Sequence, residues 1–173
     1  MRSDDSEPLL TRLARRAYRQ GFVQRWWAGR FRAPPGGDIP WTPLAKPLER
    51  CRVALLTTGG VHRRDDTPFD RTDPRGDPSF RVLPAQSASA ELTITHDHYD
   101  HRDADRDVNV VLPFGPLAAL LAERRVGALA PRHYSLMGHI DGPHVATLRE
   151  RTAPALAQRL RADGADVVVL APA

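Results

Sequence analysis

The sequence contains one cysteine, one lysine and no long hydrophobic run. Cys51 has no second cysteine to pair with among 173 residues, which excludes an internal disulfide framework and any metal site built from several thiolates. No stretch approaches the roughly 18 consecutive apolar residues of a membrane-spanning helix. No apolar segment follows the arginines near the amino terminus, as a secretory signal would require. We therefore expect a cytoplasmic protein without a membrane partner.

Positive charge comes almost entirely from arginine. Lysine and arginine total 25 against 21 acidic residues, a formal net charge of +4, and Lys46 is the only lysine. This bias is typical of a genome's base composition, so we predict no nucleic-acid partner, even though eight arginines fall within residues 1–32. A hydrophobic fraction of 41% over this length suffices for one domain with a buried core.

The chain divides by composition into an arm and a domain. Residues 7–20 carry leucine, alanine and tyrosine on one helical stripe, and residues 21–40 combine tryptophans with the breaker-rich stretch APPGGDIP. These features predict that residues 1–40 form a helical arm with an irregular extension, without a core of its own. Residues 41–173 are expected to form an α/β domain.

Short apolar runs and amphipathic stretches alternate in the predicted domain. Strands are predicted at 52–57, 92–95 and 165–172, with a further candidate at 108–113, and helices at 115–126 and 147–163. The polar, proline-rich residues 63–90 are expected to form a long loop or excursion. The last strand, ADVVVLAP, is predicted to be the most buried, and a helix followed by such a strand indicates a single α/β domain with a mainly parallel sheet flanked by helices.

The stretch TTGGVH, residues 57–62, follows the first predicted strand. Ligands of open parallel sheets gather beyond the carboxyl ends of the strands, and a diglycine allows close approach of a ligand. The candidate pocket residues here are Thr57, Thr58, Gly59, Gly60 and His62. The alternative is an ordinary tight turn. No GxGxxG or P-loop pattern is present, so nucleotide binding is not predicted.

The densest polar cluster is HDHYDH, residues 96–101. Its five neighbouring aspartates within residues 96–107 should favour the charged form of the imidazoles. Such nitrogen and oxygen ligands suit zinc, iron or manganese, and HxHxDH also fits metallo-β-lactamase-type hydrolases, with further histidines at His133, His139 and His144. A metal is not favoured, because no thiolate lies nearby and the strand-rich opening of such hydrolases is absent. A solvated acidic loop is the alternative for HDHYDH, and a plain packing loop for RHYSLMGHI (132–140).

Several segments occur together in a known order. They are WTPLAKPL, RVALLTTGGVH, PFD, GDPSFR, HDHYDHRDADRDVNVVLP, APRHYSLMGHI and DVVVLAP, spread over residues 40–172. In this order they resemble the selenoprotein B subunit of glycine, sarcosine and betaine reductase and its D-proline reductase counterpart. Ordered motifs are more specific than HxHxDH alone, so the resemblance favours a reductase over a hydrolase.

The resemblance implies an oxidoreductase that cleaves a carbon–nitrogen bond of a small amino acid or methylated amine. In the family, a selenocysteine or cysteine attacks the α-carbon and displaces the amine, and partner subunits with a thioredoxin-type reductant complete the cycle. Acid–base and orienting roles are expected for His98, Asp100, Asp107 and His133. The adjoining substrate-binding wall is expected to include the TTGGVH residues together with His96, His101 and Asn109.

The family's redox residue is expected shortly after the last strand, beyond Ala173. Cys51 cannot replace it, because it precedes the first strand at the end opposite the expected pocket. We therefore expect either a reading frame cut at a UGA codon for selenocysteine or a degenerate homologue, with no cofactor within these residues. A non-catalytic subunit that binds a metal or a partner through the His/Asp loop is the alternative, and a homo-oligomer stays open.

Overall fold

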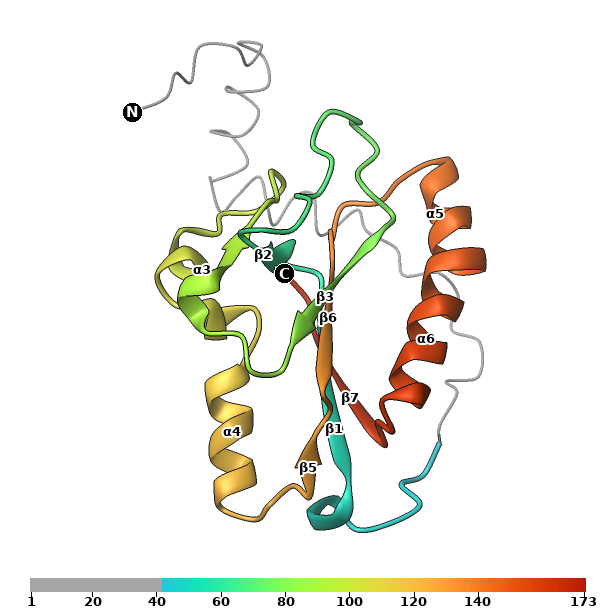
Figure 1. The fold of residues 1–173 in the computed structure, drawn as a ribbon. Coiled ribbons are helices and arrows are strands. Elements are labelled where there is room, and N and C mark those ends of the chain that lie inside the picture. Colours follow the sequence, from blue (N-terminus) through green and yellow to red (C-terminus); the bar gives the residue numbers. More distant parts are fainter. Residues whose placement is uncertain (1–41) are drawn as a thin grey trace, which may run out of the picture. The chain divides into compact units, whose positions relative to one another are not determined.

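The main sheet is built around strand β1 (Arg52–Thr57) in the computed structural model, which describes residues 42–173. Strand β7 (Val167–Ala171) pairs in parallel with one edge of β1 along Val53–Thr57. Two strands share the other edge of β1. Strand β5 (Ala128–Leu129) pairs with the beginning of β1, and strand β6 (Arg132–Leu136) pairs with its end. Strand β3 (Phe80–Pro84) pairs antiparallel with β6, so the described sheet runs β3–β6–β1–β7 (Figure 1).

Helices cover both faces of this sheet (Figure 1). Helix α4 (Phe114–Ala122) packs Leu117 against Leu55 and its neighbours on one face. A continuous helical segment packs on the other face, where Leu156 meets Tyr134. It consists of α5 (Pro143–Thr147), a π-helical turn η4 (Leu148–Thr152) and α6 (Ala153–Ala162). The predicted fold class, an α/β domain with a mostly parallel sheet, is confirmed.

A smaller layer of structure lies beside the main sheet. Strand β2 (Val61–Arg63) pairs antiparallel with β4 (Leu92–Ile94), and the short helices α3 (Arg102–Arg106) and η3 (Val108–Val110) follow. Single 3-10 turns, η1 (Leu48–Arg50) and η2 (Ser89–Glu91), precede β1 and β4. Within residues 42–173, no helix is long and apolar enough to cross a membrane. The prediction of an arm at residues 1–40 lies outside the described residues.

Three sequence predictions about strands, loops and burial are wrong. Residues 108–110 form the 3-10 helix η3 instead of starting a strand, because the Asp107 carboxylate accepts a hydrogen bond from the Asn109 amide and begins a helical turn. The expected loop at 63–90 contains strand β3. Strand β7 is not the most buried strand: Val169 is 41% exposed and Leu170 67% exposed, because β7 has a described neighbour on one side only.

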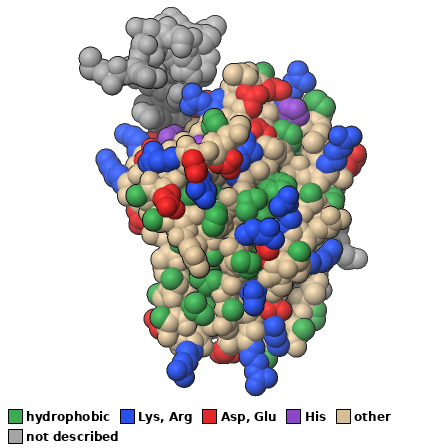
Figure 2. Space-filling view, viewed as in Figure 1, with side chains coloured by type: hydrophobic (Ala, Val, Ile, Leu, Met, Phe, Trp, Pro, Cys, Tyr) green, Lys and Arg blue, Asp and Glu red, His purple; other side chains and the backbone are tan. Residues whose placement is uncertain are grey.

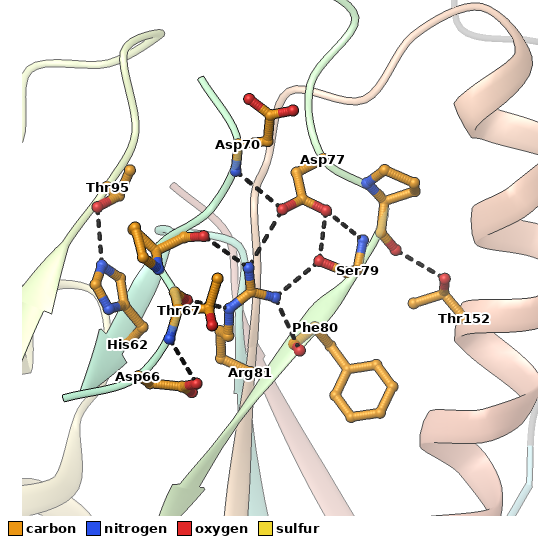
Figure 3. A network of polar contacts seen from close by, with 12 residues as sticks. His62, Asp66, Thr67, Asp70, Asp77, Ser79, Phe80, Arg81, Thr95 and Thr152 are labelled. Carbon is orange, nitrogen blue, oxygen red and sulfur yellow. Dashed lines mark hydrogen bonds and ion pairs between the residues drawn. The ribbon is translucent and has the colours of Figure 1, made fainter. Parts of the chain in front are cut away.

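A buried ion pair holds the long excursion between β2 and β3 (Figure 3). The guanidinium of Arg81 makes five hydrogen bonds, to the carbonyl oxygens of Thr67, Pro68 and Phe80, to Ser79 Oγ and to Asp77 Oδ2. Burial raises the pKa of Asp77, but hydrogen bonds from Ser79 and the Asp70 amide, with the charge of Arg81, lower it below its ordinary value overall. This network attaches residues 67–79 to the sheet.

Candidate functional site at the carboxyl ends of β1 and β7

The two later parallel strands β6 and β7 lie on opposite sides of β1. The chain reaches β6 through α4 on one face, and it reaches β7 through α5 and α6 on the other face. Ligands of doubly wound sheets bind in the crevice that such a reversal opens at the carboxyl ends of the strands. Here that position lies between β1 and β7, where the amide of Thr58 donates to Ala171 O (3.2 Å) and the amide of Ala173 donates to Thr58 Oγ1 (3.0 Å).

The TTGGVH segment forms a tight turn at this position. Gly60 has a positive φ of 67°, and a Cβ there would lie 2.5 Å from Thr95 O, so only glycine fits. The close approach that the diglycine permits is thus to the Thr95–His96 backbone. The amides of Thr58, Gly59 and Gly60 all donate within the protein, to Ala171 O, Thr57 Oγ1 and Leu136 O. The turn can line a pocket, but its backbone offers no free donors to a substrate carboxylate.

His96 is buried between the turn after β1 and the segment after β6. Its Nδ1 lies 3.0 Å from the His98 amide and its Nε2 lies 3.2 Å from the Gly138 amide. A neutral imidazole has one unprotonated nitrogen, so it accepts from one of these donors, and a charged ring could accept from neither. Burial, followed by the nearby charge of His98, lowers the pKa of His96 to about 4. The expectation that the aspartates favour imidazolium is therefore wrong for this residue.

His98 and His139 form the accessible part of the cluster. Their rings stack with centroids 3.7 Å apart, and His139 Nε2 donates to Pro74 O at 2.9 Å. His98 is exposed and His139 half-buried. Tyr99 closes the cluster by donating its hydroxyl to Gly59 O at 2.9 Å, and burial raises its pKa to about 12, so the phenol stays protonated.

Gly138 connects this cluster to the end of β7. A Cβ at Gly138 would lie 3.0 Å from Thr58 O and 3.3 Å from both Ala173 O and His96 Nε2. The segments that follow the carboxyl ends of β1, β6 and β7 therefore contact one another here. We define the switch-point cluster as Thr58, Gly59, His96, His98, Tyr99, Gly138, His139 and Ala173. Sequence reasoning did not include Tyr99, Gly138 or His139 in the site, although HDHYDH and RHYSLMGHI were both recognised as polar segments.

Four of the predicted residues are engaged in local structure. Asp100 pairs with Arg102, and His101 Nδ1 lies 2.8 Å from the Asp105 carboxylate one helical turn later. The Asp107 carboxylate also accepts from Asn109 Nδ2 at 2.8 Å, and Asn109 Oδ1 accepts from the Gly115 amide at 2.8 Å. These contacts stabilise the local structure of residues 100–115. The roles predicted for these side chains in catalysis or binding stay predictions.

Two predicted histidines lie inside the protein. His133 is fully buried on β6, where its Nδ1 accepts from the Leu55 amide at 2.9 Å, and burial lowers its pKa to about 4. Its Nε2 has no hydrogen-bond partner in the described structure. His62 is also buried, with Nε2 2.8 Å from Thr95 Oγ1 and Nδ1 2.7 Å from Arg63 O. Because His133 is fully buried, it cannot touch a substrate without opening the core, and its acid–base role stays a prediction.

Residues 24–173 match the family described as glycine/sarcosine/betaine reductase selenoprotein B. The chain belongs to this family. The resemblance inferred from the ordered motifs is thus confirmed, and no solved structure matches the chain significantly.

Two curated relatives of this selenoprotein B family chain are reductase subunits. It is 36% identical over 130 residues to the D-proline reductase subunit gamma of Acetoanaerobium sticklandii, a match that covers 75% of this chain and 52% of the relative. It is 29% identical over 141 residues to the glycine reductase complex component B subunit gamma of Carboxydothermus hydrogenoformans, covering 79% of this chain and 31% of the relative. The chain therefore spans about half of one relative and about a third of the other.

The family match does not support the metallo-hydrolase alternative. Among residues 42–173, no three histidine, cysteine or acidic side chains are arranged to hold a metal ion.

Hollows of about 620 and 550 Å³ lie away from the switch-point cluster, one at the amino-terminal end of β1 beside Arg52 and the other beside β4 and α3. In Figure 2, histidines lie toward the upper end of the face shown, and basic side chains are spread over all of it.

Proposed function

We propose that this chain supplies part of the active site of a reductase that cleaves a carbon–nitrogen bond in a small amino acid or methylated amine. The observation that carries the proposal is the position of Ala173 beside Thr58 and Gly138 in the switch-point cluster. In the family's pattern the redox residue follows the last strand. A selenocysteine or cysteine soon after β7 would thus emerge next to the His98–His139 pair.

The proposed reaction begins with substitution at carbon. The selenolate or thiolate attacks the α-carbon, a carbon–chalcogen bond forms, and the carbon–nitrogen bond breaks with its electron pair leaving on nitrogen. The departing amine takes up one proton. A thiol then attacks the chalcogen, the product carbon takes the bonding electron pair and a proton, and the resulting sulfur–chalcogen bond is reduced by an external dithiol. The dithiol is oxidised to a disulfide, which balances the two electrons gained by the substrate.

The residues of this chain would deliver a proton to the departing amine and hold the surrounding loops in place. His98 is the exposed imidazole, and its stacking on His139, which is itself bonded to Pro74 O, restricts its orientation. We assign proton delivery to the departing amine to this pair. Tyr99 and His96 bond to loop backbone and hold the turn after β1 against the segment after β6. Asp100 and His101 lie next in sequence and remain proposed orienting groups.

The same proposal includes partners. Both curated relatives are subunits by name, one of D-proline reductase and one of a glycine reductase complex. We propose that this chain likewise works with other reductase subunits and a thioredoxin-type reductant. The second candidate function, a non-catalytic subunit, retains those partners but binds no substrate at the cluster.

The test is to recover the chain, with its associated subunits, from its native cells. Dithiol-dependent turnover of glycine, sarcosine, betaine and D-proline is then measured. We expect turnover of at least one compound, and a loss of at least tenfold in kcat for His98→Ala or His139→Ala. Arg125→Ala, an exposed change before β5 at the opposite end of the sheet, serves as the control. An assembly that turns over none of the four compounds, or variants as active as the control, would contradict the proposal.

A further inference from the structure

Strand β7 has the sequence of an interior strand but the position of an edge strand. Its five residues, VVVLA, are all apolar, which is the pattern of a parallel strand with neighbours on both sides. In the described structure its partner is β1 alone. Val169 and Leu170 are left 41% and 67% exposed, and they follow one another, so they point to opposite faces of the sheet.

The opposite edge of the described sheet, strand β3, is protected against pairing with a further strand. Strand β3 carries Arg81 and ends in Pro84, and Phe80 is covered by the Arg159 guanidinium and Tyr134. Charge, proline and side-chain cover are the usual protection of an edge strand against pairing. Strand β7 has no charged residue or proline between its first and last residue.

The nearest charge does not protect β7 either. The carboxylate of Asp166, just before the strand, accepts from the Arg52 amide at 2.7 Å and pairs with Lys46 Nζ at 2.8 Å. It is therefore drawn toward β1 and away from the open edge. Strand β7 is therefore apolar, and every second residue directs its backbone donor and acceptor away from β1.

The topology indicates what belongs at this edge. The order β6–β1–β7, with crossovers on opposite faces, is the first part of a doubly wound sheet, in which the next parallel strand adds outside the third. The chain covers only 52% and 31% of its two curated relatives, so the family has further sequence available to provide that strand.

We propose that the open edge of β7 binds a parallel β-strand from the part of the selenoprotein B fold that these 173 residues do not span. That strand would be apolar on both sides and would cover Val169 on one face and Leu170 on the other. It would make β7 an interior strand and extend the sheet next to the part of the switch-point cluster where Thr58 contacts Ala173. The inference rests on family membership and topology and does not require the proposed reaction.

Hydrogen exchange on the isolated 173-residue chain provides the first measurement. We expect the alternate amides of residues 167–171 that point away from β1 to exchange as fast as exposed loops. Protection of these amides in the isolated chain, by a second copy or by residues 1–41, would overturn the proposal.

The second measurement uses the chain recovered from its native cells through an amino-terminal tag. We expect it to carry sequence that matches the rest of the selenoprotein B family, and residues 167–171 to exchange at least tenfold more slowly than in the isolated chain. Leu170→Asp should abolish this protection while leaving the melting temperature of the isolated chain unchanged. Val110→Asp, which is 63% exposed on η3, is the matched control. Recovered material that lacks family sequence, or that leaves β7 unprotected, contradicts the inference.

Discussion

Replacing Arg81 with alanine should destabilise the domain far more than any exposed arginine would. The side chains of Arg81 and Asp77, its ion-pair partner, are only 10% and 11% exposed. Removing one partner of a buried pair leaves the other charge uncompensated and costs about 3–5 kcal/mol. For a domain of this size, such a loss lowers the melting temperature by roughly 10 °C or more. Arg81→Lys keeps the charge but not the planar fork of donors, so an intermediate loss is expected.

The matched control for this change is Arg106→Ala. Arg106 pairs with Asp103 at 3.1 Å, but both side chains are about 80% exposed, and such a pair contributes less than about 1 kcal/mol. Urea denaturation followed by circular dichroism gives both free energies of unfolding. In Arg81→Ala, hydrogen exchange should rise first in residues 67–79, which carry Pro74 toward His139. Equal losses in the alanine variants of Arg81 and Arg106 would refute the reasoning.

Three further predictions concern the interior and the turn. The pKa of His133 is lowered from its ordinary value to about 4 by burial, so the unfolded chain binds a proton that the folded chain does not between about pH 6.5 and 4, and stability falls as pH falls through this window. His133→Asn, which keeps an acceptor for the Leu55 amide, should remove up to about 2 kcal/mol of that loss in urea titrations at pH 7 and 5; identical pH dependence in both proteins contradicts this. Gly60→Ala should cost at least about 2 kcal/mol, measured by thermal melting, because of its positive φ and the contact with Thr95 O; an unchanged melting temperature would show that the turn relaxes. Tyr99→Phe should cost about 1 kcal/mol through its lost hydrogen bond, and a variant as stable as the parent would disprove that contribution.

Local pattern predicted two of the four parallel strands and the helices beside the sheet, but it did not predict β5 or β6. The runs RVALLT and DVVVLA became β1 and β7, and the amphipathic stretches became α4 and the helical segment 143–162. The candidate at 108–113 failed because a carboxylate that caps a turn outweighs β-branched residues when no strand is available to pair with. Strand β3 was missed because its pairing with β6 is a long-range choice, made within a stretch whose prolines and aspartates indicate loop.

The site was predicted in position more than in composition. The rule that places ligands at the carboxyl ends of strands led to TTGG and HDHYDH, which do meet there. Sequence alone could not tell that His133 points into the core, because strand direction and face are set by pairing. Nor could it tell that Gly138 brings the segment after β6 against His96, since that contact joins residues 42 positions apart.

The contacts at the switch-point cluster limit what its groups can do. The amides of Thr58, Gly59 and Gly60, the phenol of Tyr99 and the ring of His96 all serve contacts within the protein. Groups already bonded inside the fold position their neighbours but do not bind a charged ligand without losing those bonds. For the proposed function, a substrate carboxylate would therefore need donors from outside these groups, and the accessible stacked pair of His98 and His139 would deliver the proton. A strand added beside β7 would bring its following loop to the same end of the sheet, in a position to supply such donors to the proposed site.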